Sequence, residues 1–292
     1  MATASKPTST APDVRLEVRA LRPQERDLAL ARLHSRTRAD LFLIDVVRQL
    51  APAGRGDGEA EVLGAWRGET LVGLASARPT IVLETALPAD VLTALVGPLA
   101  TLSMGLIRSS APGVAPLWTE LARRRRRALV DRLEVSLVLE PEDFRPAPAP
   151  AGVRVRTAAP ADLDRLVEAA RASLREEHRP DPFLGDPRGF RRWVASRRER
   201  ALVVERAGRV ASVGYADVQL AEGWLLQGVY SWPDQRRQGL AAAGVSALCE
   251  RAFGAGAGHV QLSVVEGNAA AIALYARLGF RRHAMLRTIL FS

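Results

Sequence analysis

Two apolar patterns alternate along most of this chain. Short runs of β-branched, aromatic and aliphatic residues predict buried strands, and apolar residues three or four positions apart predict helices. In the second half, the pattern predicts strands over residues 153–156, 201–205, 210–220, 224–230 and 259–265. Helices are expected there over residues 161–174, 187–198, 240–253 and 269–278. This mixed order indicates an α/β (α+β) domain.

The first half repeats the same order of elements. Strands are expected over residues 16–20, 62–67, 71–84, 104–109 and 134–140. Helices are expected over residues 23–35, 39–50 and 89–99, with a further helix from Pro116. Between the halves, residues 145–152 alternate proline with small residues, which favours a stiff, extended spacer. We therefore predict a flexible tail (1–14), a first domain (15–144), a linker (145–152) and a second domain (153–292).

The composition is ordinary for a globular protein. Of the 292 residues, 48% are hydrophobic and 25% are charged, so disorder is not expected. The single cysteine, Cys249, excludes an intrachain disulfide, fits a reducing compartment and is expected to be buried in a helix. The four histidines lack zinc-ligand spacing, so no metal site is expected. Because no targeting segment is evident near residue 1, we expect a cytoplasmic protein.

The charge of the chain does not by itself identify a partner. A net charge of +9 raises the question of nucleic acid, because basic surfaces bind phosphates. However, the five arginines at 123–127 fall at the expected end of a helix, where cations complement the helix dipole and solvent. Nucleic acid is therefore not the expected partner. A membrane is not expected either, since the apolar stretch 87–107 is broken by proline and glycine.

The turn between the strand at 224–230 and the next helix has chemistry suited to a diphosphate. At a helix N-terminus the first N–H groups lack partners and the positive end of the dipole points outward. Gly239 carries no Cβ that would hold a phosphate away, and Ala241 is small. Arg236 and Arg237 add two cationic groups. An ordinary polar loop capped by arginines would show the same residues.

A second pattern follows the strand at 259–265. Asn268 is placed to cap the helix at 269–278, and Gly279 to end it. Ala271 and Tyr275 lie four positions apart, so they share a helix face and leave room beside the phenol. Capping by Asn268 and core packing by Tyr275 are the structural alternatives to a role in binding.

In this order, Arg236-x-x-Gly239-x-Ala241 and the later Asn268, Tyr275 and Gly279 resemble the GNAT superfamily of acyl-CoA-dependent N-acyltransferases, in particular its FR47-like branch. The resemblance implies a twisted mixed sheet flanked by helices, with two central strands splayed apart to admit the pantetheine arm of acetyl-CoA. It implies catalysis by Tyr275 near the thioester sulfur. The implied cofactor-binding residues are Val229, Tyr230, Ser231, Arg236, Arg237, Gln238, Gly239, Leu240, Ala241, Asn268 and Ala271.

The proton acceptor is the uncertain part of the implied mechanism. Many GNAT relatives carry a glutamate on the strand before the turn, whereas this chain has Gln227, which cannot take a proton. At pH 7 a neutral lysine-like amine costs about 4.6 kcal/mol and a neutral α-amine about 1.4 kcal/mol, which favours an acceptor of low pKa. The remaining candidates for the base are Asp217, Glu222, Glu176, Glu177 and His178.

The first half resembles a degenerate GNAT-like module. Where its phosphate turn would lie, residues 83–88 contain neither arginine nor glycine, and Glu84 would repel a diphosphate. We therefore expect tandem GNAT-like folds in which only the second half binds CoA. An unrelated α/β domain is the alternative.

The expected function is transfer of an acetyl group from acetyl-CoA to a primary amine of a small molecule or peptide. The alternative is a non-catalytic acyl-CoA-binding regulatory module, in which Gln227 marks a lost base. The acceptor, the acyl length and the oligomeric state stay open.

Overall fold

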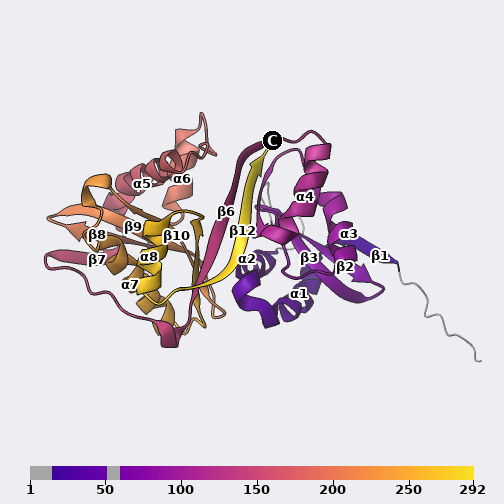
Figure 1. Ribbon diagram of the computed structural model, residues 1–292, viewed down its shortest axis with the longest axis horizontal. Coiled ribbons are helices and arrows are strands. Elements are labelled where there is room, and N and C mark those ends of the chain that lie inside the picture. Colours follow the sequence, from indigo (N-terminus) through magenta and orange to yellow (C-terminus); the bar gives the residue numbers. More distant parts are fainter. Residues whose placement is uncertain (1–14, 51–59) are drawn as a thin grey trace, which may run out of the picture.

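The computed structural model describes residues 15–50 and 60–292. The tail predicted over residues 1–14 lies outside this range. Figure 1 shows two lobes, each a sheet with helices packed on it, joined by two long strands that run side by side. The mixed α/β architecture predicted for both halves is confirmed.

The C-terminal lobe has helices on both faces of its strands. One face packs on α5 and α6, and the other packs on α7 and α8. The strands are β7 (Val153–Thr157), β8 (Ala201–Arg206), β9 (Arg209–Gln219), β10 (Trp224–Ser231), β11 (Val260–Val265) and β12 (Arg281–Phe291). The helices are α5 (Leu163–Glu176), α6 (Pro187–Ala195), α7 (Leu240–Gly254) and α8 (Ala269–Arg277).

The N-terminal lobe has the same arrangement. Helices α1 and α2 cover one face of its strands, and α3 and α4 cover the other. The strands are β1 (Leu16–Ala20), β2 (Glu61–Arg67), β3 (Thr70–Arg78), β4 (Val82–Leu83), β5 (Gly105–Ser110) and β6 (Ala128–Leu139). The helices are α1 (Arg26–Leu33), α2 (Thr37–Arg48), α3 (Ala89–Leu99) and α4 (Ala111–Arg123). Short 3-10 turns include η5 (Arg198–Arg200) and η6 (Pro233–Gln235).

Three predicted elements of the first half differ from the structure. The strand predicted over 71–84 is divided into β3 and β4, because Pro79 interrupts the ladder. The helix predicted from Pro116 begins five residues earlier, and Pro116 lies inside α4 within its first two turns. The strand predicted over 134–140 is the second half of β6, which has 12 residues.

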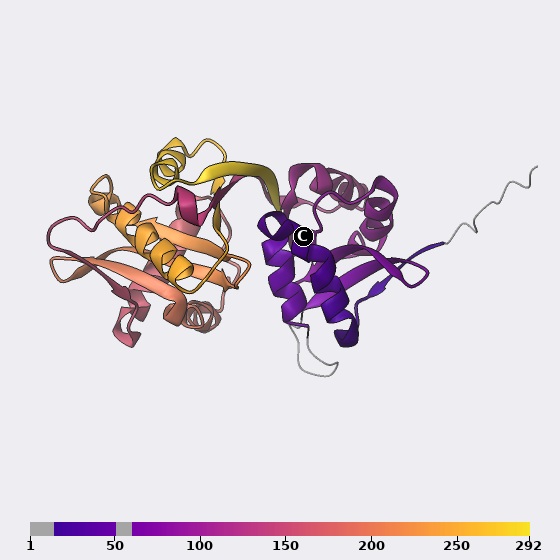
Figure 2. The ribbon, with the colours of Figure 1, turned by 90° about the horizontal axis from the view of Figure 1, so that it is seen from below.

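The two lobes exchange strands. One sheet has the order β1-β2-β3-β4, and an eight-stranded sheet has the order β5-β12-β6-β11-β10-β9-β8-β7. The end of β6, from Glu134 to Leu139, pairs with β11 of the C-terminal lobe. The end of β12, from Leu286 to Phe291, pairs with β5 of the N-terminal lobe. In Figure 2 β12 crosses from one lobe to the other, so each lobe receives a strand from the other half of the chain.

Contacts outside the sheet also join the lobes. Leu41 of α2 packs against Val218 and Leu225 of the C-terminal lobe, and all three side chains are buried. An ion pair between Arg38 and Glu140, at 2.5 Å, lies at the same junction. These contacts place α2 against β9 and β10.

The segment predicted as a spacer packs on the C-terminal lobe. The N–H of Arg145 donates to the carbonyl of Leu278, and the N–H of Ala147 donates to the hydroxyl of Ser246. Proline and small residues therefore form a fixed connection along α7. None of the helices in the described residues is long and apolar enough to span a membrane.

Because β12 crosses into the N-terminal lobe, its last residue, Phe291, is a core residue of that lobe. Phe291 is 1% exposed and packs among side chains of the N-terminal lobe, including Trp118 at 6.4 Å between ring centroids. We expect Phe291→Ala to lower the free energy of unfolding by about 3–5 kcal/mol, as for other buried aromatic residues. Urea denaturation measures it, with Leu184→Ala as control because Leu184 is 91% exposed. A loss below about 1 kcal/mol would contradict the exchanged strand.

Candidate acyl-transfer site

The central strands of the C-terminal lobe separate. The parallel strands β10 and β11 pair only at Trp224 with Val260 and at Leu225 with Gln261. Beyond Leu225, no hydrogen bond among the described residues joins β10 to β11. Backbone groups that face the gap therefore lack protein partners, and an extended ligand with amide groups can supply them.

A β-bulge lies on β10 beside this gap. Gln227 pairs with Tyr215 and Tyr230 pairs with Val213, so one residue too many lies on β10 between them. Gly228 has a φ of +59°, and a Cβ there would lie 2.2 Å from Cε1 of Tyr215. Only glycine fits this position, and the bulge leaves Val229 out of the ladder with β9.

Helix α7 begins at the end of β10 with free N–H groups. Gly239, with a φ of +77°, is the N-cap residue, and no side chain caps this end. The first backbone bond back to the turn runs from the N–H of Ala243 to the carbonyl of Gly239, 3.0 Å away. The N–H groups of Leu240, Ala241 and residue 242 have no acceptor among the described residues. This end of α7 can therefore bind an anion.

Arg236, one of the two arginines of the turn, already has a carboxylate partner. One terminal nitrogen lies 2.7 Å from both carboxylate oxygens of Glu176, and Nε donates to the carbonyl of Ser231 at 3.0 Å. The hydroxyl of Tyr230 also donates to Glu176, at 3.0 Å. A diphosphate at this turn must therefore share Arg236 with Glu176, whereas Arg237 has no ion pair among the described residues.

The second motif is arranged as a cap and a buried phenol. The side chain of Asn268 accepts from the N–H of Ala271 at 3.1 Å, which confirms the capping predicted for it. Tyr275 is buried beside Phe280, and burial, followed by the neighbouring Cys249, raises the pKa of its phenol. The raised pKa keeps the phenol protonated, and no hydrogen bond among the described residues uses its hydroxyl, so it can donate to a ligand.

The four carboxylates among the candidates for the base are each held in an ion pair. These pairs are Asp217 with Arg197, Glu222 with Arg48, Glu176 with Arg236, and Glu177 with Arg132. The fifth candidate, His178, is exposed at the end of α5. In each pair the guanidinium occupies carboxylate oxygens that would otherwise be open to an amine.

Two polar residues near the gap were not predicted from the sequence. Tyr215 lies against Gly228, and burial, followed by Asp217, raises the pKa of its phenol to about 12. Glu134, contributed by β6, is buried between Arg132 at 2.8 Å and Arg108 at 3.5 Å. Burial raises its pKa, but the two guanidinium groups outweigh this and lower it. Glu134 is found only through the strand exchange.

The corresponding gap in the N-terminal lobe is closed by the protein itself. Ile81 and Ile107 form a parallel bridge, as Trp224 and Val260 do in the other lobe. Beyond this bridge, the hydroxyl of Ser109 accepts from the N–H of Leu83 at 3.2 Å and donates to the carbonyl of Leu83 at 3.0 Å. A side chain of β5 therefore satisfies the β4 backbone that an inserted ligand would need.

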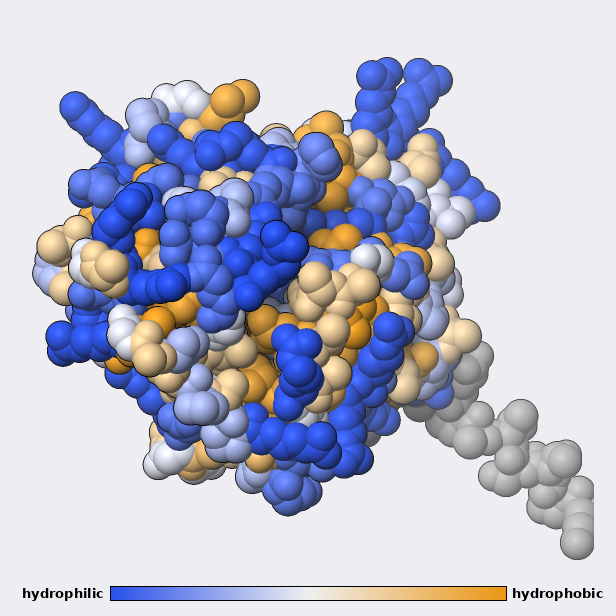
Figure 3. Space-filling view, turned by 60° about the vertical axis from the view of Figure 1, so that its left-hand side comes forward, coloured by the Kyte–Doolittle hydropathy of each residue, from blue (hydrophilic) through white to orange (hydrophobic). Residues whose placement is uncertain are grey.

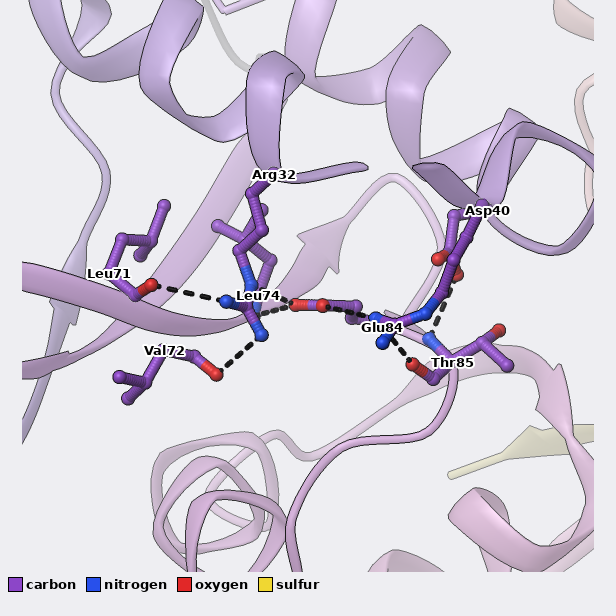
Figure 4. Close-up of polar contacts among 8 residues, drawn as sticks. Arg32, Asp40, Leu71, Val72, Leu74, Glu84 and Thr85 are labelled. Carbon is purple, nitrogen blue, oxygen red and sulfur yellow. Dashed lines mark hydrogen bonds and ion pairs between the residues drawn. The ribbon is translucent and has the colours of Figure 1, made fainter. Parts of the chain in front are cut away.

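Glu84 reinforces this closure rather than facing a ligand. Its carboxylate is fully buried and accepts from Arg32 at 2.8 Å, from Arg36 at 3.2 Å and from the N–H of Leu74 at 3.0 Å (Figure 4). The arrangement differs from the one predicted for Glu84. Instead of repelling a diphosphate from an open turn, the carboxylate holds α1 on strands β3 and β4.

Metal and thiol chemistry find no support in the described part of the chain. No three His, Cys, Asp or Glu side chains there are grouped as metal ligands. Cys249 is buried, as predicted, and burial raises the pKa of its thiol.

The face in Figure 3 is mostly hydrophilic, with apolar patches between charged side chains.

The sequence of the C-terminal half matches a family model. Residues 163–280 match the model of the Acetyltransferase (GNAT) family. This segment is a GNAT domain. The match includes the gap between β10 and β11, the N-terminus of α7 and both motifs of the sequence, so the resemblance inferred from those residues is confirmed. No curated protein matched the chain.

Solved structures share the fold of nearly the whole chain. A Drosophila protein is 16% identical, with a TM-score of 0.70 over 94% of this chain and 98% of its own. A GCN5-related N-acetyltransferase from Sphaerobacter thermophilus is 17% identical, with a TM-score of 0.61 over 97% and 96%. A tandem GNAT protein from the clavulanic acid biosynthesis pathway is 16% identical, with a TM-score of 0.57 over 95% and 98%. The tandem GNAT fold is thereby confirmed. The family match of residues 163–280 supports acyl transfer in general.

The closure of the first GNAT-like lobe gives a stability prediction. We expect Glu84→Gln to lower the free energy of unfolding by about 2–3 kcal/mol, because two arginines lose their shared anion. The loss stays below that of a fully buried pair since the Arg36 side chain is 42% exposed. Urea denaturation measures it, with the exposed turn residue Glu69→Gln as the control. Equal stability of the two variants would show that Glu84 does not hold the lobe together.

Proposed function

We propose that this protein is an acyl-CoA-dependent N-acetyltransferase that transfers an acetyl group from acetyl-CoA to a primary amine of a small molecule or peptide. The observation that carries the proposal is the open gap between β10 and β11 beside the uncapped N-terminus of α7. One feature suits a chain of amides and the other suits a diphosphate. The closed gap of the first lobe limits acyl-CoA to the second lobe.

In the proposed complex, the pantetheine arm lies along β10 at Val229, Tyr230 and Ser231. The backbone N–H and C=O of Val229 are the most open to hydrogen bonds with the arm, because Val229 has no partner in the ladder with β9. The carbonyl of Tyr230 already accepts from the hydroxyl of Ser212 at 2.9 Å. Asn268 and Ala271 lie at the start of α8 and border the same arm, with Asn268 engaged in capping.

The diphosphate is assigned to the start of α7, over the residues Arg236, Arg237, Gln238, Gly239, Leu240 and Ala241. Unpaired N–H groups and the helix dipole supply most of the attraction. A Cβ at Gly239 would lie 3.5 Å from Pro150, so the linker between the lobes borders this site. These contacts involve no metal.

The reaction joins the amine nitrogen to the thioester carbon and breaks the carbon–sulfur bond. A neutral amine attacks the carbonyl, an N–H of the β10 bulge binds the oxyanion, and the thiolate leaves. Tyr275 donates its proton to the sulfur, which becomes the free thiol of CoA, and the proton that the nitrogen loses as the amide forms restores the phenol. The raised pKa of Tyr275 keeps this proton available at neutral pH.

The second candidate function is a non-catalytic acyl-CoA-binding module, which Gln227 favours because this residue cannot act as a base. Both functions require acyl-CoA binding, and only the first requires turnover. Incubation with acetyl-CoA and a varied set of amines, with detection of free thiol, separates them. Amine-dependent thiol release supports the enzyme, and binding without release supports the module. We place either activity in the cytoplasm, in keeping with the single reduced Cys249.

The diphosphate site is tested by Gly239→Glu. We expect this variant to lose acyl-CoA binding by at least about 100-fold, because it brings a side chain and a negative charge to the helix N-terminus. Isothermal titration with acetyl-CoA measures it. Gly254→Glu is the matched control, since it adds the same side chain at the open, opposite end of α7. Unchanged affinity of Gly239→Glu would remove the diphosphate from this helix.

The role of Tyr275 is tested by Tyr275→Phe. We expect kcat to fall by about 10- to 1000-fold while the affinity for acetyl-CoA stays the same, because the ring keeps its packing and only the donor is removed. Thiol-release kinetics and calorimetry give the two quantities. If kcat is unaltered, Tyr275 is a packing residue.

A further inference from the structure

The proposed reaction still needs a group that takes the proton of the amine. Gln227 cannot do so, and the four acidic candidates named from the sequence are bound to arginines. Carboxylates of the N-terminal lobe that face the strands β9 and β10 are therefore candidates as well. Among the described residues one candidate comes from the other lobe: Asp45, on α2.

The position of Asp45 follows from its helix. Leu41, Asp45 and Arg48 lie at i, i+4 and i+7, so they share one face of α2. Leu41 packs on Val218 and Leu225, and Arg48 pairs with Glu222. The face of α2 that carries Asp45 is thus applied to the C-terminal lobe, at the junction visible in Figure 1.

The strands opposite this face carry the polar residues nearest the bulge. Val218 pairs with Leu225, and Tyr215 pairs with Gln227 beside Gly228. Paired residues of neighbouring strands point to the same face of a sheet. Since Leu41 of α2 contacts Val218 and Leu225, α2 covers the face that also carries Gln227 and Tyr215. Asp45 therefore borders the side of the gap from which an acceptor approaches.

Asp45 forms no ion pair with the cations near it in the described residues. Its only hydrogen bond among the described residues is to the amide of Gln49, at 2.7 Å on the same helix, and it has no ion pair there. Asp217 of β9 faces it and repels it. Arg48 and Arg200 attract it, but Arg48 is paired with Glu222 and Arg200 donates to the carbonyl of Asp217.

This environment favours a neutral carboxyl or a bound cation. Burial, followed by repulsion from Asp217, raises the pKa of Asp45, which brings it closer to that of an effective base. Asp45 is half-buried on the face of α2 that packs on the C-terminal lobe, and among the described residues it forms no ion pair. A protonated amine is a cation that can pair with it.

We propose that Asp45 of the N-terminal lobe binds the protonated primary amine of the acceptor opposite Asp217 and takes its proton before acyl transfer. The step converts R–NH3⁺ and the carboxylate into R–NH2 and the carboxylic acid, and the nitrogen lone pair then forms the bond to the thioester carbon. The acid returns its proton to solvent after the product leaves. The inference rests on the proposed acetyltransferase function and makes the first lobe part of the acceptor site.

The acceptor class follows from the charges. An amine that is cationic in solution is attracted by Asp45, whereas an acceptor with a carboxylate next to its amine brings an anion towards Asp45 and Asp217, of which only Asp217 is paired with an arginine. A primary amine without a neighbouring acidic group is therefore the favoured substrate.

The test uses the full-length protein, acetyl-CoA and the best amine from the thiol-release panel. We expect Asp45→Asn to lower kcat/KM for the amine by about 100-fold, the low end of the contribution of a general base, with acetyl-CoA affinity unchanged. Asp45→Glu should recover part of the loss. Asp27→Asn is the matched control, because Asp27 is an aspartate of the same lobe whose side chain is 87% exposed. Thermal unfolding of all variants shows whether they are folded.

The pH profile supplies a readout that a structural role would not change. Activity requires ionised Asp45, so kcat/KM falls as pH drops through its pKa. Because Asp217 raises that pKa, Asp217→Asn should move this acidic limb to lower pH. In Asp45→Asn the limb should disappear.

The outcomes separate the inference from the function on which it rests. Lack of acetyl-CoA binding or of thiol release in the unmodified protein overturns both. Normal binding and turnover, with Asp45→Asn within twofold of the unmodified protein, overturns the role of Asp45 alone. An acidic limb that does not move in Asp217→Asn also overturns it.

Discussion

The exchange of strands between the lobes is the constraint on which the rest of this structure depends. β6 leaves the first lobe to pair with β11, and β12 returns to pair with β5, so neither lobe completes its sheet alone. The interior of the first lobe contains Ile289 and Phe291 from the end of the chain. The relative position of the lobes is therefore fixed by backbone hydrogen bonds. A rigid junction of this kind allows α2 to act as a wall of the neighbouring lobe.

Backbone hydrogen bonding also explains how one fold gives an open gap in one lobe and a closed one in the other. Two parallel strands that separate leave N–H and C=O groups without partners, and such groups need either water, a ligand or a side chain. In the first lobe the hydroxyl of Ser109 serves both groups of Leu83. In the second lobe no described side chain does this for Val229. The two lobes share the order of their elements. They differ in whether a side chain forms hydrogen bonds with the backbone of the separated strands.

The sequence predicted what depends on local chemistry. The glycine and alanine at the start of α7, the Asn268 cap and the interruption of the apolar stretch 87–107 follow from rules that operate within one turn or helix. Strand partners are not local, so the exchange of β6 and β12 was not predicted, and neither was the position of Glu134 between Arg132 and Arg108. Glu84 was recognised as acidic, but its burial by Arg32 and Arg36 depends on how α1 packs. The signal for Asp45 in the sequence is its spacing. It follows Leu41 by four residues, so both lie on one face of the same helix.

The end of α5 connects the two sides of the open gap. Glu176 pairs with Arg236 on the turn after β10, and the next residue, Glu177, pairs with Arg132 on the strand from the other lobe. An anion bound at the turn competes with Glu176 for Arg236, because both need the same guanidinium donors. The end of α5 is thus tied to both sides of the gap, and only the tie through Arg236 lies at the turn where an anion would bind.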